Sequence, residues 1–206
     1  MKLYYSPGAC SLAPHIVLCE AGVPHQLVKV DLRRHQLPDG ADYYAINPKG
    51  GVPAIDIGDG VVLTEGVAVL QYLAERHAPA LAPAKGALER ARLHEILNYV
   101  SSDYAKAYTP LFYLAEGASR ADAQRPVIAR LGYLESLLAD GRAFILGPQF
   151  SVADAYVFAV TRWAGDFGIG LDAVPALKAY MARVAARAAV QQALLAEGLT
   201  MDGAQG

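Results

Sequence analysis

Cys10 lies between a short aromatic run, Tyr4 and Tyr5, and an apolar helical pattern that includes Leu12 and Ile16. This position puts a thiol near the first turn of a helix, where unpaired backbone N–H groups and the helix dipole favour negative charge. A free cysteine has a pKa of about 8.5, and a helix start favours the thiolate, which is the nucleophilic form. Cys10 is therefore the first candidate for reactive chemistry in this chain.

Two later segments carry groups that suit a small anion. Residues 49–54 contain two glycines and a proline, a turn-forming pattern that precedes an apolar run. Glu65 and Gly66 open a second predicted helix, where free backbone N–H groups can bind a carboxylate and the Glu65 side chain can pair with an ammonium group. Together with Cys10, these segments predict a pocket for a small anion that carries a thiol.

Composition and charge argue against several other classes of protein. The chain has 206 residues, enough for one large or two small domains, and it is 54% hydrophobic and 18% charged, which argues against disorder. Lysine plus arginine number 6 in residues 1–80 and 12 in residues 81–206, against 8 and 12 acidic residues, so neither half is basic. No run approaches the roughly 18–20 apolar residues that span a bilayer, and the start holds no secretory pattern. We expect a cytoplasmic protein with no nucleic-acid or membrane partner.

The two cysteines do not indicate a disulfide framework. If Cys10 and Cys19 share a helix, their separation along its axis is about 13.5 Å, whereas a disulfide tolerates a Cα separation of about 7 Å. Cys19 is therefore expected to pack as a small apolar side chain. The five histidines are scattered along the sequence, so no metal site is expected.

The first 80 residues predict a small mixed sheet with helices. Strands are expected at residues 2–5, 27–31, 54–57 and 61–63. A helix begins near Cys10 or Ser11, because Pro14 is tolerated only in a first turn, and Gly22 ends it. A second helix ends at about His77. The early strand–helix–strand order favours parallel pairing, and the last two strands form an antiparallel hairpin.

Beyond a proline-containing linker at residues 79–83, the pattern is helical. Apolar residues recur at helical spacing in residues 93–100, 127–138 and 177–184. Pro126 is expected to open the second of these helices. Ser151 and Asp154 form a capping pattern, which we interpret as a folding signal and not as a catalytic pair. The chain is thus predicted to form two domains, residues 1–80 and residues 86–206.

Four segments in order resemble one known family. They are SPGACS at 6–11, NPKGGVPA at 47–54, LTEGVA at 63–68 and FSVADAY at 150–156. The chain resembles the cytosolic glutathione transferases, most of all the bacterial beta class, over nearly its whole length. The resemblance implies an α+β, two-domain fold with a thioredoxin-like mixed-sheet N-terminal domain and an all-α C-terminal domain. It also implies a homodimer that joins glutathione, as co-substrate and with no further cofactor, to small apolar electrophiles, or that uses it to reduce peroxides and disulfides.

The same resemblance implies roles for residues of the first domain. Cys10 would either donate a hydrogen bond to the glutathione sulfur or form a mixed disulfide with it. The nearby hydroxyls of Ser11 and Tyr5 could take over this contact, and Ser11 is expected beside Cys10 as a second catalytic residue. The Val52-Pro53 bond would be cis, with the Val52 backbone pairing with the cysteinyl part of glutathione. Two contacts at the ends of the ligand complete the set, with Glu65 and Gly66 at the γ-glutamyl group and His35 at the glycyl carboxylate.

In the helical domain the resemblance implies contacts from Asn98, Ser102 and Asp103, the last of which would reach the partner subunit's glutathione. Ala105 stands where the beta class usually has a histidine close to the sulfur, so a proton acceptor and donor is missing there. Aromatic residues that could line an electrophile pocket or simply form core are Tyr108, Tyr113, Tyr156 and Trp163. The departures at Ala105 and at His35, where matching members of the family often have a lysine, keep an alternative open, a protein that binds or buffers glutathione or apolar ligands with little catalysis.

Overall fold

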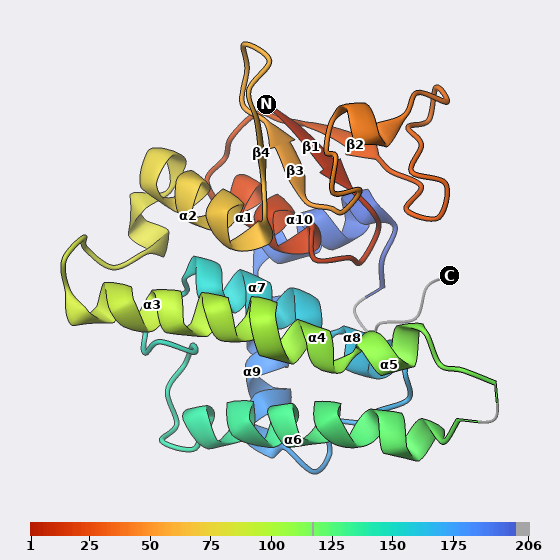
Figure 1. Cartoon of the computed structure of the whole chain (residues 1–206). Coiled ribbons are helices and arrows are strands. Elements are labelled where there is room, and N and C mark those ends of the chain that lie inside the picture. Colours follow the sequence, from red (N-terminus) through yellow and green to blue (C-terminus); the bar gives the residue numbers. More distant parts are fainter. Residues whose placement is uncertain (117, 201–206) are drawn as a thin grey trace.

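A computed structural model describes residues 1–116 and 118–200, with a small sheet at one end and helices below it (Figure 1). The elements of the first part are β1 (Lys2–Tyr5), α1 (Leu12–Glu20), β2 (Gln26–Lys29), the 3-10 turn η1 (Tyr43–Ala45), β3 (Ala54–Asp56), β4 (Val62–Thr64), α2 (Gly66–His77) and the 3-10 turn η2 (Pro79–Leu81). Their order is the one that the sequence predicts, with strand ends that differ by one or two residues.

The four strands form one mixed sheet in the order β2-β1-β3-β4. β1 and β2 are parallel, with Leu3 opposite Leu27. β3 is antiparallel to both of its neighbours, β1 and β4. The parallel pair needs a crossover connection, which α1 provides, whereas the hairpin of β3 and β4 needs only a tight turn. The mixed sheet expected from the sequence is confirmed.

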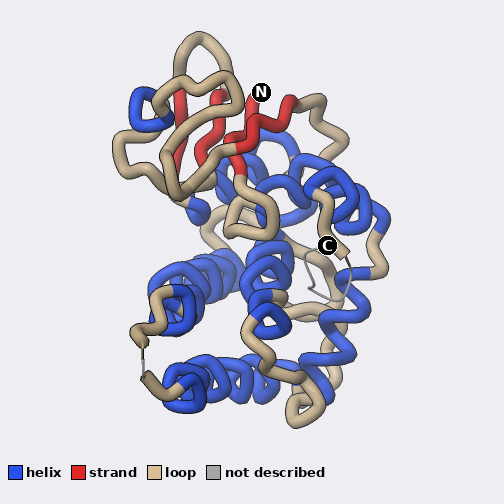
Figure 2. Tube along the Cα trace, turned by 90° about the vertical axis from the view of Figure 1, so that its right-hand side faces the viewer, coloured by secondary structure: helices blue, strands red, loops and turns tan. Residues whose placement is uncertain are grey.

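The two faces of the sheet are covered differently. Leu3 and Ile55 point into the core that the helices share, whereas Tyr4 packs on the other face with Val30 and Tyr43 from the loop that follows β2. This alternation follows from the two-residue period of a strand. α1, α2 and α10 lie against the first face (Figure 1), and Figure 2 shows the same layering from the side.

Among the residues described, the regular elements of the second part are helices joined by loops. Its elements are α3 (Leu88–Tyr99), the π-helical segment η3 (Val100–Tyr104), α4 (Ala105–Ala107), α5 (Thr109–Phe112), α6 (Arg120–Leu138), α7 (Val152–Thr161), α8 (Trp163–Asp166), α9 (Pro175–Ala185) and α10 (Ala188–Glu197). α10 returns to the first part and packs along α1. The α+β fold with a helical second part is therefore confirmed.

One expected helix boundary is wrong. Pro126 lies inside α6, which begins at Arg120 and has Ser119 as its N-cap. The Ser119 hydroxyl accepts a hydrogen bond from the Asp122 backbone N–H at 3.2 Å, and this cap sets the start of the helix. Buried Ala123 extends the packed face before the proline, so tertiary contacts maintain the helix through a residue that usually ends one.

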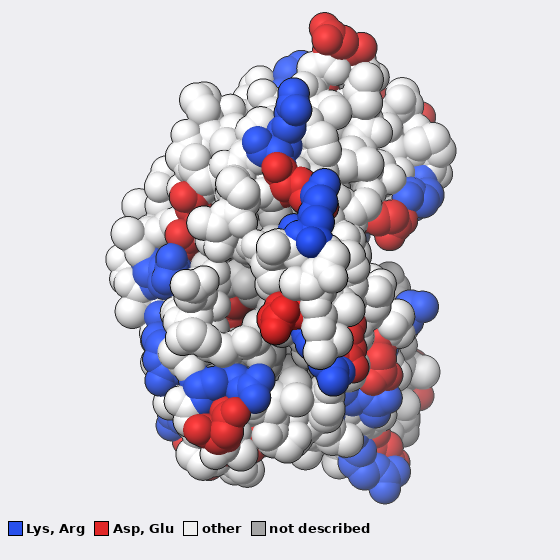
Figure 3. All heavy atoms as spheres, turned by 90° about the vertical axis from the view of Figure 1, so that its left-hand side faces the viewer, with Lys and Arg blue, Asp and Glu red and all other residues white. Residues whose placement is uncertain are grey.

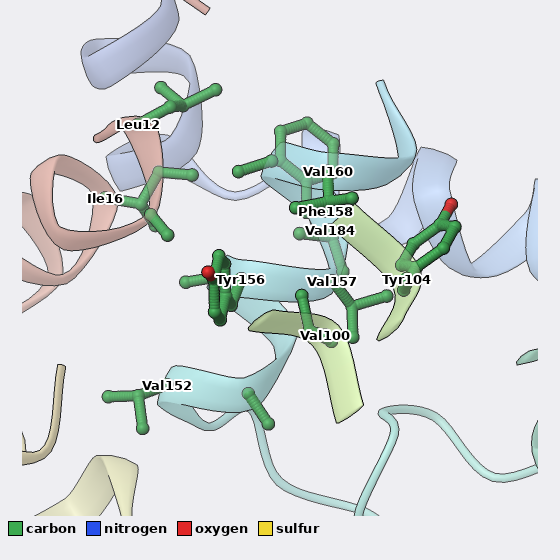
Figure 4. Close-up of a cluster of buried hydrophobic side chains, with 14 of the residues drawn as sticks. Leu12, Ile16, Val100, Tyr104, Val152, Tyr156, Val157, Phe158, Val160 and Val184 are labelled. Atoms are coloured by element: carbon green, nitrogen blue, oxygen red, sulfur yellow. The ribbon is translucent and has the colours of Figure 1, made fainter. Parts of the chain in front are cut away.

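α7 runs through the centre of the core, and all of its residues are buried. Ser151 and Asp154 form the capping box that the sequence predicts at its start. In Figure 4, Leu12 and Ile16 of α1 face the side chains of α7, and Tyr156 projects from α7 on the side nearer α1. The connected core includes residues of both parts, so α7 is the structural link between them.

The surface agrees with the balanced charge of the sequence. Figure 3 shows lysine and arginine interspersed with aspartate and glutamate on one face of the molecule. Within residues 1–116 and 118–200, no helix is long and apolar enough to cross a bilayer.

Candidate functional site

Cys10 lies in the turn just ahead of α1, which begins at Leu12 with Ser11 as N-cap. The Leu12 N–H donates to the Ala9 carbonyl at 2.9 Å and thereby forms this turn. The Cys10 side chain is half-buried against the common core. The Tyr156 hydroxyl, from α7, lies beside the Cys10 thiol as its side-chain hydrogen-bond partner. The thiol thus lies where the first helix of one part meets the central helix of the other.

The pKa of the Cys10 thiol does not follow the expectation from its place at a helix start. Burial raises this pKa from an ordinary 9.0 to about 11, although a hydrogen bond to its own backbone and one from Tyr156 act in the opposite direction. The free-energy cost of removing water from the thiolate is larger than the stabilisation that the local hydrogen bonds and backbone dipoles provide. The expectation of an easily formed thiolate is therefore wrong for this structure, and Cys10 is a protonated thiol at neutral pH.

Ser11 does not present its hydroxyl to a ligand. Its side chain is fully buried. The Ser11 Oγ accepts from the Ser6 N–H at 3.2 Å and donates to the Ser6 carbonyl at 3.3 Å. The hydroxyl thus closes the loop that carries Cys10, and the expectation that Ser11 is a catalytic group is corrected to a structural role. Tyr5 is also buried, and its ring lies 6.5 Å from that of His15.

The Val52-Pro53 peptide bond is cis, as expected. The loop before it is held by the Gly51 carbonyl, which accepts from the Tyr43 hydroxyl at 2.9 Å and from the Asn47 side chain at 2.7 Å. Two such bonds to one carbonyl fix the direction of the backbone just before Val52.

The start of α2 meets this turn and α7 at Gly66. A Cβ on Gly66 would lie 3.5 Å from the Tyr156 hydroxyl and 3.9 Å from the Pro53 Cδ. Since the same hydroxyl is the partner of the Cys10 thiol, the turn that carries Cys10 and the start of α2 meet at one phenol, and the cis turn lies beside them at Gly66. The N–H groups in the first turn of α2, which have no acceptor within the helix, are therefore close to the same phenol.

Glu65, the N-cap of α2, has φ 69°, a region that side chains other than glycine rarely occupy. Its exposed carboxylate pairs with Lys49 Nζ at 2.5 Å, and Lys49 also donates to the Thr64 hydroxyl at 2.8 Å. A strained backbone is a known feature of ligand-binding positions. Because Lys49 already pairs with the Glu65 carboxylate, an ammonium group of a ligand would have to replace Lys49 or share the carboxylate with it.

His35 lies across the loop from the cis turn. It also has a positive φ of 52°, its Nδ1 lies 3.2 Å from the Gly50 carbonyl oxygen, and its ring is 4.5 Å from that of Tyr44. A Cβ on Gly50 would approach these two rings to 2.9 and 2.8 Å, and its φ is +71°, so only glycine fits there. Arg34 is exposed beside Asp31.

The three residues of the helical part that were expected to contact glutathione differ in exposure and in their partners. Asn98 and Ser102 are both exposed, and the Ser102 hydroxyl donates to the Asn98 carbonyl at 2.8 Å. Asp103 forms an ion pair with Arg130 of α6, with 2.8 Å between Asp103 Oδ1 and Arg130 Nη2. Ala105 is half-buried against the core. A contact from Asp103 to a partner subunit stays a prediction.

The sequence interpretation missed the contact role of Tyr156 and did not consider Ser101. The Ser101 hydroxyl lies beside the Tyr156 hydroxyl as a hydrogen-bond partner, and burial, followed by the neighbouring Cys10, raises the pKa of Tyr156. Helical spacing marks Tyr156 only as a core position, because its hydroxyl is directed by a contact with another part of the chain. Trp163 was expected either to line a pocket or to form core. Its Nε1 donates a hydrogen bond to the Gly8 carbonyl at 2.7 Å, which anchors the turn before Cys10.

Two cavities have linings that bear on the expected ligand sites. One of about 490 Å3 is lined by the linker after α2, α3, α6 and the loop before α7. The other, of about 680 Å3, is lined by Ser6, Pro7 and residues between 29 and 40, and it borders the turn that carries Cys10. Cys10 is in neither lining, so the electrophile pocket expected in the helical domain stays a prediction. Of the aromatic candidates for it, Tyr108 is buried and Tyr113 is exposed.

The histidines are not all scattered in space. His15 and His25 come together with Cys19 at the far end of α1. This corrects the reason for which no metal site was expected.

Comparison with known proteins gives one consistent result. The family model described as "Glutathione S-transferase, N-terminal domain" matches residues 8–76, and that described as "Glutathione S-transferase, C-terminal domain" matches residues 96–188. Glutathione S-transferase GstA of Escherichia coli O157:H7 is 43% identical over 206 residues, which are 97% of this chain and 100% of the relative.

Solved structures agree with these sequence matches. A bacterial beta-class glutathione S-transferase of Sphingomonas chungbukensis superposes with a TM-score of 0.90 at 44% identity, covering 97% of this chain and 100% of its own. A sphingomonad glutathione S-transferase in complex with glutathione superposes with a TM-score of 0.89 at 45% identity and the same coverage.

Proposed function

This chain belongs to the glutathione S-transferase family, and we propose that it transfers glutathione to small apolar electrophiles at a site beside Cys10. The observation that carries this proposal is the convergence at one phenol. The Tyr156 hydroxyl bonds the Cys10 thiol and lies against the start of α2, next to the cis turn at Pro53. A tripeptide thiol needs a sulfur partner, a backbone partner and an anion site, and these three elements supply them.

Cys10 acts in this proposal as a hydrogen-bond donor to the glutathione sulfur. A pKa of about 11 keeps the free thiol protonated at neutral pH, and an S–H group is a weak donor. A donor directed at the sulfur stabilises the glutathione thiolate, which attacks the electrophile as the leaving group departs with its bonding electrons. A mixed disulfide, in contrast, requires Cys10 itself as thiolate and is disfavoured at neutral pH.

The rest of glutathione is proposed to bind along the first part of the chain. The γ-glutamyl carboxylate would accept hydrogen bonds at the start of α2 near Gly66, and its ammonium group would pair with Glu65. The Val52 backbone would pair with the cysteinyl residue, and His35 lies at the end of the loop suited to the glycyl carboxylate. Asp103 would contribute across a homodimer interface.

Conjugation and glutathione affinity test this proposal together. The wild-type protein is expected to bind glutathione at millimolar concentration or below and to conjugate it to a chlorinated aromatic compound. Cys10→Ala should slow conjugation and abolish any glutathione-dependent disulfide reduction, because only the second reaction needs a bond to the Cys10 sulfur. Cys19→Ala is the matched control. Absence of glutathione binding in the wild-type protein contradicts the proposal.

A second candidate function is binding or buffering of glutathione with little catalysis. It is favoured by Ala105, which supplies no acid–base group that could help to activate the glutathione sulfur. Tight glutathione binding without turnover across several classes of electrophile would select this function over transfer.

A further inference from the structure

Three side chains with metal-binding atoms meet at the end of α1. His15 and Cys19 are four residues apart on that helix, so they lie on one face, and His25 comes just before β2. One ligand atom from each residue lies within 4.8 Å of the other two. The two imidazole rings are 5.4 Å apart at an angle of 79°. The turn between α1 and β2 thus brings two nitrogen ligands and one sulfur ligand to the same place.

Each histidine has its Nδ1 held by an acceptor. The His15 Nδ1 lies 2.8 Å from Glu197 Oε1, and the His25 Nδ1 lies 2.7 Å from the Val23 carbonyl oxygen. A carboxylate and a carbonyl only accept hydrogen bonds, so in the neutral rings the proton is on Nδ1. The Nε2 atom of each ring then carries a free lone pair. Histidines that bind metals have this arrangement, in which the second nitrogen donates to a carboxylate or a backbone carbonyl.

Glu197 holds its place independently of any ligand. It comes from α10, its side chain is fully buried, and its other oxygen accepts from the Gly8 N–H at 2.9 Å. Its carboxylate therefore orients the His15 ring and fixes the turn at Gly8 at the same time. The neighbouring acid, Glu20, is paired with Arg187, with 2.6 Å between Glu20 Oε1 and Arg187 Nε.

We propose that His15, Cys19 and His25 form a binding site for a divalent cation of the zinc type, with a fourth coordination position open to water. Zinc takes nitrogen ligands at about 2.0–2.1 Å and sulfur at about 2.3 Å, which sets tetrahedral ligand separations of about 3.5 Å. The ligand atoms have to approach by about an ångström to reach these separations. Cys19 and His25 are half-buried at the edge of the molecule and can make that shift. On binding, the thiol proton is released to solvent and the two histidines keep their Nδ1 protons.

This site is separate from the one proposed for glutathione. Cys10 precedes α1, whereas Cys19 lies in its last turn, and none of the three ligands is in the set assigned to the tripeptide. A bound cation would join α1 to the start of β2 and, through Glu197, to α10. The expected consequence is stabilisation of this corner of the fold, without a role in the transfer reaction.

Cobalt(II), a spectroscopic substitute for zinc, tests the proposal on the whole protein after treatment with a chelator. Cobalt is expected to bind with one equivalent and to produce thiolate-to-cobalt absorption in the near ultraviolet, together with the visible bands of a tetrahedral ion. Zinc should displace it, and binding should release about one proton. Cys19→Ser removes the sulfur ligand and should abolish the near-ultraviolet absorption. His25→Phe keeps a ring in place and should weaken cobalt binding at least about tenfold.

Cys10→Ser is the matched control, since it removes the other cysteine and should leave the cobalt spectrum unchanged. The thermal midpoint gives a second readout, which zinc should raise in the wild-type protein and in Cys10→Ser but not in Cys19→Ser. The proposal is overturned if cobalt gives no thiolate absorption with the wild-type protein, or if that absorption survives in Cys19→Ser. His15 is not replaced, because its side chain is buried against Glu197 and its replacement would disturb folding as well as metal binding.

Discussion

The Tyr156 hydroxyl, at the centre of α7, is the side-chain hydrogen-bond partner of the Cys10 thiol, in the turn that precedes α1. The two residues belong to different parts of the chain, and the bond forms only because α7 packs directly beneath α1. The helical part therefore does more than cover the sheet. It supplies a polar group to the position where sulfur chemistry is proposed.

Replacement of Tyr156 by phenylalanine tests this contact. The ring keeps its place in the core, while the Cys10 thiol loses a hydrogen-bond partner, so we expect kcat/KM for conjugation to fall about two- to tenfold, the range of one hydrogen bond. Tyr104→Phe is the matched control, because it removes a buried hydroxyl that bonds Thr161 at 3.1 Å. Equal kinetic losses in the two variants would assign the effect to general destabilisation.

The raised pKa of Cys10 predicts a particular pH dependence of alkylation. With a pKa of about 11, the thiolate fraction is small at neutral pH and grows about tenfold for each pH unit until the pKa is approached. In a Cys19→Ala background, the rate of reaction with iodoacetamide should therefore rise continuously from pH 7 to pH 10. A plateau near pH 7–8 would contradict the prediction, since it would place the pKa below the ordinary value.

Introducing histidine at Ala105 should increase the rate of conjugation. Ala105 lies one helical turn beyond Ser101, whose hydroxyl contacts Tyr156, so an imidazole there would extend toward the same region. A well-placed acid–base group contributes about 10²–10⁴-fold, and with unoptimised placement we expect a gain of about tenfold. Lys106→His, at the exposed neighbouring position, is the control and should give no gain. No increase in Ala105→His would favour a role for other groups near the sulfur.

The Glu65 carboxylate should contribute to affinity through the ammonium group of glutathione. We expect Glu65→Gln to weaken binding about two- to fivefold, the range of an exposed ion pair. A glutathione analogue without that amino group should bind the variant and the wild-type protein equally. Lys49→Gln breaks the same internal ion pair but keeps the carboxylate. Calorimetry that finds the same loss in both variants would assign the effect to the loop and not to the ammonium contact.

Asp154 should be important for stability and not for transfer. Its buried carboxylate accepts from the Ile145 N–H at 2.8 Å, the Ser151 N–H at 2.7 Å and the Tyr180 hydroxyl at 3.0 Å. Asp154→Asn leaves buried donors without acceptors, and we expect the free energy of unfolding to fall by about 2–4 kcal/mol. Ser151→Ala should lower it by only about 0.5–2 kcal/mol. Chemical denaturation that ranks the two variants in the reverse order would contradict this account.

Local sequence patterns determined most of the architecture. The turn-forming residues around Gly50 and Pro53, the short alternating strands and the capping residues before α7 act over a few positions, and the structure has each of them where the pattern predicts. Pro126 is the exception, because an earlier cap and a packed face extended α6 past a residue that locally favours a helix start. Local preference is a weak constraint once burial opposes it.

The properties of the site depended on tertiary structure. From the sequence, Cys10 was at a helix start that favours negative charge, but its pKa depends also on how much water the folded chain removes, and α7 is more than a hundred positions away. In the same way, Cys19 seemed an ordinary apolar residue until the turn before β2 brought His25 beside it and α10 brought Glu197 to His15. The sequence alone determined most elements of the first part and the longer helices of the second, because their causes are local. Only the packed structure decided which side chains meet, because burial and contact between distant segments are properties of the whole chain.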